Sequence, residues 1–239
     1  MFFKKAVLVI HGFAGGVYDE EKLINYLQLN KSFDVFSYTL PGHEKNLSKV
    51  NYEDWMDKSI EQVEWLIQNN YKTIYVIGHS MGGVIASFLA TKYKQIKKLV
   101  LAAPAFEYLQ VKQDSINLVK NIKETPSIIK THSFEEVFSR LLKLNIGAVK
   151  EFRKLVKAYY DCPKNIDIPI LILQGTNDKI VPISSSTYVY ESVKSKTKKL
   201  VIINDATHDI FKDRKIDEIN KLVEKFLLKK EFGNKIVEM

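Results

Sequence analysis

The sequence predicts an α/β protein with a mostly parallel sheet of about six strands and helices packed on its faces. Short runs rich in Val, Ile and Leu alternate along the chain with segments of helical periodicity. Four of the six runs are nearly continuous rather than alternating, which is typical of strands buried on both faces of a parallel sheet. The predicted strands are 6–10, 33–40, 73–77, 98–102, 170–173 and 199–203.

Helices are predicted between the strands from capping signals and apolar spacing. Asn51 followed by Asp54 marks a helix start, after which apolar residues recur at helical spacing. Residues 81–93 are apolar on nearly every side, as expected for a helix packed against a central sheet. A last amphipathic helix carries its apolar residues at Ile216, Ile219, Leu222, Val223 and Phe226.

Residues 106–165 break this alternation because they contain no convincing strand. Ser133 and Glu136 form a capping-box pattern, and helical apolar stripes follow. Because ~60 helical residues are too many for a simple crossover, we expect a core of residues 1–105 and 166–239 with a helical cap, 106–165, inserted in it. The apolar stripes of this cap include Phe134, Phe138, Leu141, Phe152, Val156 and Tyr159.

Composition narrows the class of protein. Hydrophobic residues make up 46% of the chain and charged residues 27%, and no apolar run reaches the ~18 residues of a membrane helix. The first apolar stretch, 6–10, is shorter than the ~7–15 residues of a secretory signal. We therefore expect a cytoplasmic protein without stable membrane insertion. Cys162 is the single cysteine, so no internal disulfide forms, and a bystander thiol is the favoured interpretation.

The net charge of +8 raises the question of a nucleic-acid partner. Arginine, which is preferred for bidentate contacts with bases and phosphates, occurs at Arg140, Arg153 and Arg214 only. The lysines are spread along the chain and form no basic stripe interleaved with aromatic residues. We expect solvated surface lysines and no nucleic-acid partner, with weak attraction to an anionic lipid or acidic substrate as the alternative.

One serine lies between two glycines at the point where a predicted strand meets a predicted helix. In the segment GHSMG, Gly78 and Gly82 each lie two positions from Ser80. Glycine at both positions removes the Cβ atoms that a sharp strand-to-helix turn would crowd, which leaves the serine hydroxyl above the sheet edge. Because G-x-S-x-G requires this strand-to-helix context, we predict that Ser80 is a nucleophile.

A serine nucleophile needs a base, and the base needs an orienting acid. Of the two histidines that follow the serine, His132 lies beside a predicted helix start, whereas His208 follows the last predicted strand. Asp178 follows the preceding strand, which makes the chain order Ser, Asp, His. Two rival acids lie nearer to the histidine in sequence, Asp205 and Asp209. We prefer Asp178 as the orienting acid, because the carboxylate must approach the imidazole ring from a neighbouring strand end.

An oxyanion intermediate needs main-chain donors. The N–H of Met81, directly after the nucleophile, is the first expected donor, and the N–H of Phe13 in the glycine-rich loop 11–16 is the second. This loop lacks the G-K-[ST] of a phosphate-binding loop, and the chain lacks the G-x-G-x-x-G of a nucleotide fingerprint. His79 is predicted to point elsewhere, and His43, in a Pro-Gly turn, is given no catalytic role.

Five segments carry a family resemblance: HGF at 11–13, PGHE at 41–44, GHSMGG at 78–83, GTNDKIVP at 175–182 and the loop around His208. They cover almost the whole chain in order, and together they resemble the α/β-hydrolase fold superfamily, above all small bacterial carboxylesterases and monoacylglycerol-lipase-like enzymes. The resemblance implies a helical cap between the sixth and seventh strands of the full fold. The first two strands of that fold are expected to be missing, because the chain begins almost directly at the strand before the oxyanion loop.

This resemblance and the motifs lead to one functional expectation. We expect a serine hydrolase that needs no cofactor or metal and cleaves small-molecule carboxylic esters of short-to-medium acyl length. Ser80, His208 and Asp178 would act through an acyl-enzyme intermediate. A thioesterase or an aminopeptidase with the same residues is the first alternative, and a non-catalytic receptor or scaffold of the same fold is the alternative from another class. The oligomeric state has no signal in the sequence.

Overall fold

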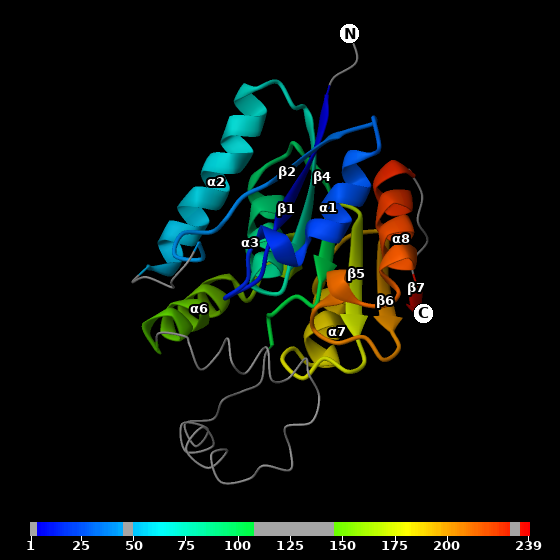
Figure 1. The fold of residues 1–239 in the computed structure, drawn as a ribbon. Coiled ribbons are helices and arrows are strands. Elements are labelled where there is room, and N and C mark those ends of the chain that lie inside the picture. The colour runs from blue at the N-terminus through cyan, green and yellow to red at the C-terminus, as the bar shows by residue number, and fades with distance from the viewer. Residues whose placement is uncertain (1–3, 45–49, 108–145, 230–234) are drawn as a thin grey trace.

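The computed structural model describes residues 4–44, 50–107, 146–229 and 235–239. Its centre is a seven-stranded sheet in the order β2-β1-β3-β4-β5-β6-β7 (Figure 1). Every neighbouring pair in this sheet is parallel. The strands are β1 Lys5–Ile10, β2 Asp34–Ser37, β3 Thr73–His79, β4 Ile96–Ala102, β5 Ile170–Gly175, β6 Lys198–Ile203 and β7 Lys235–Glu238.

The six predicted strands are all present, and β7 is an additional one. The expected count of about six was therefore one strand short. β7 pairs with β6 through its backbone, from Lys199↔Lys235 to Ile202↔Glu238, and three of its four side chains are exposed. A short edge strand of this kind needs no buried apolar run, so the hydrophobic pattern did not reveal it.

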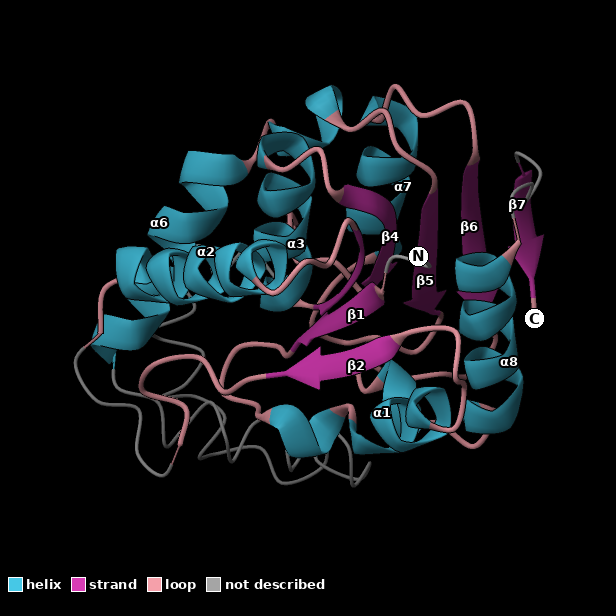
Figure 2. Ribbon diagram, turned by 90° about the horizontal axis from the view of Figure 1, so that it is seen from above, coloured by secondary structure: helices cyan, strands magenta, loops and turns pink. Residues whose placement is uncertain are grey.

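The helices cover both faces of the sheet. Figure 2 shows α1 and α8 on one face and α2, α3 and α7 on the other. The three helices predicted between the strands are confirmed as α2, α3 and α8, and the apolar stripe at Phe152, Val156 and Tyr159 lies on a helix, α6, as predicted. No helix was predicted at α1 or α7. The bounds are α1 Glu21–Gln28, α2 Tyr52–Gln68, α3 Met81–Lys92, α6 Ile146–Tyr159, α7 Ile183–Ser192 and α8 Ile216–Leu228, with short 3-10 helices at Val17–Asp19, Cys162–Asn165 and Ile210–Lys212.

Alternate residues of the central strands face opposite layers. In β1, Leu8 and Ile10 belong to the core cluster beneath α2 and α3, whereas Val7 and Val9 belong to the cluster beneath α1 and α8. Burying each such side chain stabilises the fold by ~1.5–3 kcal/mol. The continuous apolar runs in the sequence are the consequence, because both faces of each central strand are covered.

The predicted cap lies largely outside the described residues. The Ser133–Glu136 capping box and the stripe that follows it fall there, so the division into core and cap stays a prediction. Within the described part, α6 packs on α2 and α3 and buries Phe152, Leu155 and Val156. None of the described helices is long and apolar enough to cross a membrane.

Candidate active site

The strand-to-helix turn after β3 holds Ser80 in a strained conformation. Its φ of 54° and ψ of −117° lie outside the regions that residues with a Cβ atom usually adopt. Hydrogen bonds maintain this conformation: Ser80 N–H donates to Ala102 O at 2.9 Å, and Ser80 O accepts from Gly83 N–H and Ala105 N–H at 2.9 and 3.1 Å. A strained residue that its surroundings hold so firmly indicates a functional role.

The two glycines that flank this serine are required by close backbone approach. A Cβ atom at Gly78 would lie 2.3 Å from Gly82 O, and a Cβ atom at Gly82 would lie 2.3 Å from Ile10 O. The second contact brings the start of α3 against the end of β1. The glycines thus place the serine beside the loop that follows β1, as the sequence pattern predicts.

Gly82→Ala is expected to destabilise the protein by about 3 kcal/mol, the upper range for overpacking, because its methyl group would meet main-chain atoms that cannot move aside. Gly83→Ala is the matched control on the next residue of α3. Its Cβ atom would lie 3.1 Å from Pro104 Cα and Cβ, a contact that a shift of a few tenths of an ångström relieves, and alanine favours the helix by ~1 kcal/mol. Urea unfolding of the two variants measures the difference, and equal losses of stability would contradict this account of the turn.

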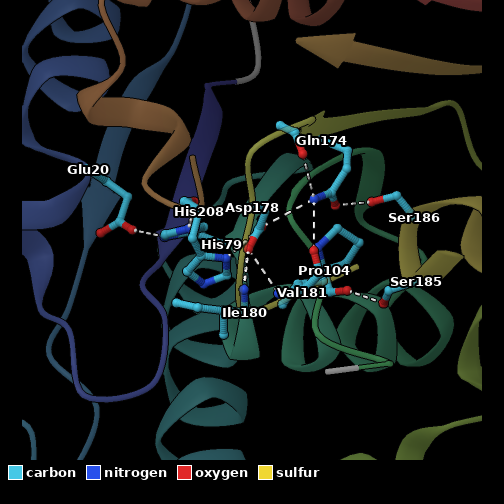
Figure 3. Close-up of polar contacts among 11 residues, drawn as sticks. Glu20, His79, Pro104, Gln174, Asp178, Ile180, Val181, Ser185, Ser186 and His208 are labelled. Atoms are coloured by element: carbon cyan, nitrogen blue, oxygen red, sulfur yellow. Dashed lines mark hydrogen bonds and ion pairs between the residues drawn. The ribbon is translucent and has the colours of Figure 1, made fainter. Parts of the chain in front are cut away.

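The structure brings Asp178 and His208 together at the same edge of the sheet. His208 Nδ1 donates to Asp178 Oδ2 at 2.8 Å, and the second oxygen, Oδ1, accepts from Ile180 N–H and Val181 N–H at 2.8 and 2.9 Å (Figure 3). Burial acts to raise the pKa of Asp178, but the hydrogen bonds from His208 and the two amides hold that pKa below its ordinary value. The carboxylate is therefore ionised at neutral pH, and His208 Nε2 is left as the basic ring nitrogen.

The loops after β5 and β6, which carry Asp178 and His208, are joined by main-chain hydrogen bonds. Asn177 N–H donates to Ala206 O at 2.9 Å, and Thr176 N–H donates to Ile203 O at 3.0 Å. Asp205, the rival acid, instead faces outward and pairs with Arg214 at 3.0 Å, where both side chains are about 70% exposed. Asp209 has no contact with the His208 ring among the described hydrogen bonds, and His132 lies outside the described residues.

A buried amide beside the acid was not anticipated from the sequence. Gln174, fully buried at the end of β5, donates from Nε2 to Asp178 Oδ2 at 3.2 Å and to Val181 O at 3.1 Å. Ser186 Oγ donates to Gln174 Oε1 at 2.7 Å, which determines the orientation of the amide. The available signal was a polar residue at the end of an otherwise apolar strand, ILILQG.

The glycine-rich loop after β1 places the peptide that carries the Phe13 N–H beside Ser80. Gly12 O accepts from His11 Nδ1 at 2.8 Å and from Gly15 N–H at 3.3 Å. Because the peptide is planar and trans, the Phe13 N–H points the opposite way from this carbonyl. A Cβ atom at Gly12 would lie 3.1 Å from Ser80 Cβ, so this peptide lies beside the serine.

His11 holds this loop as a neutral imidazole. Its Nε2 accepts from Leu40 N–H at 3.0 Å, so the proton must be on Nδ1, which donates to Gly12 O. Burial lowers the pKa of His11 to about 4, which keeps the ring uncharged. The sequence places His11 in this loop but carries no signal of its role there. The N–H of Met81, the other expected donor, belongs to the first residue of α3, where helix geometry supplies no acceptor.

Aromatic rings pack around this loop. The Phe13 ring stacks on Phe152 of α6 at 5.1 Å between centroids and meets His43 and Trp55 edge-on at 5.9 Å. Burial lowers the pKa of His43, whose Nδ1 lies 3.1 Å from Pro41 O. His43 therefore belongs to a neutral aromatic cluster, and the expectation that it has no catalytic role stays a prediction.

Both ring nitrogens of His79 make hydrogen bonds with groups other than Ser80, and one of these partners, Glu20, had no signal in the sequence. His79 Nδ1 lies 2.9 Å from Glu20 Oε1, and both side chains are buried. Burial by itself lowers the pKa of His79, but the Glu20 carboxylate raises it to about 9. Burial raises the pKa of Glu20 as well, against the opposing effect of His79. Both shifts mean that the folded pair retains a proton that the unfolded chain releases.

This retained proton predicts a fall in stability with rising pH. A pKa raised from 6.5 to about 9 contributes stability that is complete below pH 6.5 and is lost as pH rises through 9. One proton corresponds to a slope of at most ~1.4 kcal/mol per pH unit. Urea unfolding between pH 6 and 10 measures this dependence of the free energy of unfolding on pH. In the Glu20→Gln variant the slope should be smaller. Asp19, Asp209 and Lys212 are the other charged groups around the pair. A slope that is unchanged in Glu20→Gln would contradict the assignment of the pH dependence to His79 and Glu20.

A reactive thiol or a metal site, elsewhere in the described part of the chain, would form a second centre. Burial raises the pKa of Cys162 to about 11, so its thiol is protonated and unreactive at neutral pH. Among the described residues, no group of three His, Cys, Asp or Glu side chains could hold a metal ion.

Comparison with known proteins agrees with this geometry. The profile of the family described as "alpha/beta hydrolase fold" matches residues 5–126, just over half of the chain, and a profile described as "Serine aminopeptidase, S33" matches residues 138–215. A carboxylesterase of Bacillus subtilis is 25% identical over 94% of this chain and 93% of its own length. A thermostable monoacylglycerol lipase of Bacillus sp. is 23% identical over 84% and 82% of the two chains.

The fold has close structural neighbours. The structure of a metagenome-derived lipolytic enzyme superimposes with a TM-score of 0.75 at 19% identity, covering 95% of this chain and 96% of the other. At this identity the likeness concerns the fold alone. The seven-stranded parallel sheet, the turn at Ser80 and the family profile agree. The chain belongs to the α/β hydrolase fold family.

Proposed function

We propose that this chain, an ester-hydrolysing α/β hydrolase, cleaves carboxylic esters with Ser80 as nucleophile, His208 as base and Asp178 as orienting acid. One observation carries the proposal. A part-buried hydrogen bond of 2.8 Å joins Asp178, in the loop after β5, to His208, in the loop after β6, at the sheet edge where the turn after β3 holds Ser80 in a strained conformation. The names of the carboxylesterase and the monoacylglycerol lipase among the relatives support the same class of substrate.

The reaction follows from the protonation states of the site. As Ser80 Oγ attacks the acyl carbonyl, its proton passes to His208 Nε2, and the Phe13 and Met81 N–H groups stabilise the oxyanion. The C–O bond to the alcohol then breaks, and His208 returns the proton to the leaving oxygen. A water molecule, deprotonated by His208, attacks the acyl-enzyme. The bond between Ser80 Oγ and the acyl carbon then breaks, His208 returns its proton to Ser80 Oγ, and the carboxylic acid leaves. Asp178 stays ionised throughout and stabilises the imidazolium.

We expect a preference for short-to-medium acyl chains without activation by lipid interfaces. Phe152 of α6 lies on Phe13 of the oxyanion loop, so an apolar side chain borders the position of the acyl carbonyl. Rates for esters of increasing acyl length, measured below and above the aggregation point of each substrate, check this prediction. A sharp rise in rate on aggregation, together with a preference for long chains, would indicate a true lipase.

A serine-directed fluorophosphonate gives the first test of the proposal. Covalent labelling of Ser80, located by peptide mass spectrometry, is expected together with turnover of p-nitrophenyl esters. A chain that is neither labelled nor active would be a non-catalytic receptor or scaffold. We also propose, as expected from the sequence, that the substrate is a small molecule, that the protein is cytoplasmic and that it has no nucleic-acid partner.

The match to the serine aminopeptidase profile supports a second candidate. An aminopeptidase with the same three residues would cleave aminoacyl p-nitroanilides, and a thioesterase would cleave acyl thioesters. Comparison of kcat/KM for matched ester, thioester and anilide substrates separates the three. We expect the ester to be preferred, and a higher value for the anilide would transfer the assignment to a peptidase.

A further inference from the structure

Two buried side chains outside the proposed Ser80–His208–Asp178 triad hold the main chain of His208. His79 Nε2 lies 2.9 Å from His208 O, and His79 Nδ1 lies 2.9 Å from Glu20 Oε1 (Figure 3). The two imidazole rings are 5.0 Å apart between centroids. The same carbonyl also accepts from Ile210 N–H at 2.9 Å. His208 is thus held through its ring by Asp178 and through its carbonyl by His79 and by Ile210 of its own loop.

The hydrogen-bond pattern determines which nitrogen of His79 carries a proton. A carbonyl oxygen only accepts, so His79 Nε2 must donate to His208 O. The proton between His79 Nδ1 and Glu20 Oε1 is on either partner, which gives an ion pair or a neutral pair. In both cases Glu20 keeps the donating hydrogen of His79 directed at His208.

We propose that Glu20 and His79 are positioning residues for His208. Glu20 fixes the orientation and tautomer of His79, and His79 fixes the main chain from which the imidazole of His208 projects. The inference rests on the proposed function, in which His208 Nε2 must meet Ser80 Oγ. A base displaced by ~1 Å can cost ~10²-fold in rate, so a second attachment point has a direct catalytic consequence.

The energetics of this pair favour a role beyond stability. Replacing a buried ion pair with apolar residues is often neutral or stabilising, so such a pair is weak evidence for a stabilising function. Glu20 is fully buried, and its Oε2 has no hydrogen-bond partner among the described residues, which adds a desolvation cost.

The position of Glu20 connects two parts of the site. It directly follows Val17–Asp19, the short helix after the oxyanion loop, and the neighbouring Asp19 forms an ion pair with Lys212. Asp19 therefore contacts the segment 208–212 directly through Lys212, and Glu20 is connected to the same segment through His79. This arrangement couples the loop that carries Phe13 to the loop that carries the base.

Two substitutions at Glu20 separate positioning from stability. Glu20→Leu removes the partner of His79, whereas Glu20→Gln can donate its amide hydrogen to His79 Nδ1 and so preserve the tautomer. Glu224→Leu is the matched control, because Glu224 on α8 also accepts two hydrogen bonds from another segment, from Tyr26 and Asn30. Each variant is titrated with fluorophosphonate, so that kcat is expressed per labelled Ser80.

We expect Glu20→Leu to lower kcat roughly 10- to 100-fold with little change in KM, and Glu20→Gln to recover most of the loss. Glu224→Leu should lower the unfolding midpoint but keep the wild-type kcat. In a cycle with His79→Leu, the double variant should lose no more than His79→Leu alone, because Glu20 acts through His79.

A stable Glu20→Leu variant with the wild-type kcat per labelled site would overturn the inference and leave a structural pair. Additive losses in the cycle would also overturn it, because Glu20 would then act by another route. Absence of labelling in the wild-type protein would instead refute the proposed function, which keeps the two failures distinguishable.

Discussion

Ser80→Ala is expected to lower kcat by ~10⁶-fold and leave the fold intact, as for other serine hydrolases. Alanine removes the attacking oxygen, and no neighbouring residue can replace it from the strained turn. The conformation itself should persist, since it is held by main-chain hydrogen bonds of Ser80 with Ala102, Gly83 and Ala105. Substrate binding should change little, so the loss appears in kcat rather than KM.

Ser87→Ala is the matched control for this prediction. Ser87 lies on the same helix, α3, and its hydroxyl donates to Gly83 O at 2.7 Å, so the variant removes a buried hydroxyl without touching the turn. Ester turnover and fluorophosphonate labelling of both purified variants provide the measurement. Near-normal turnover by Ser80→Ala would end the nucleophile assignment.

Local patterns made much of this fold predictable. The apolar runs of β1, β3, β4 and β5 report burial on both sides, and Asn51 N–H donates to Asp54 as the capping signal predicts. The turn at Ser80 was predictable because strand, glycines and helix are contiguous. Asp178 and His208 were predictable from chain order, since parallel strands bring their carboxyl ends to one edge of the sheet.

The supporting contacts could not be predicted, because they join residues that are distant in the sequence. His79 is 59 positions from Glu20 and 129 from His208, and its hydrogen bonds depend on how the loop after β1 lies against the loop after β6. The contact between Gln174 and Ser186 depends similarly on α7 packing under β5. Each residue alone had a simpler interpretation as a core or helix residue.

Asp178→Asn is expected to lower kcat by roughly 10⁴-fold, because asparagine imposes the wrong tautomer on His208. The Ile180 and Val181 N–H groups donate to Oδ1, so the amide oxygen of an asparagine must lie there. The amide nitrogen then faces His208 Nδ1 and donates to it. This places the imidazole proton on Nε2, where the ring can no longer accept the proton of Ser80.

The same variant also sets the new amide nitrogen against a donor. In the wild-type protein Gln174 Nε2 donates to Asp178 Oδ2, and the Val181 carbonyl, which can only accept from Nε2, prevents that amide from turning over. A modest loss of stability should accompany the loss of rate. Asp205→Asn, the matched exposed carboxylate, should keep nearly wild-type kcat, because Asp205 pairs only with Arg214 among the described side chains. Steady-state kinetics of both variants decide the assignment: the reverse ranking would make Asp205 the orienting acid and reduce the Asp178–His208 hydrogen bond to a structural contact.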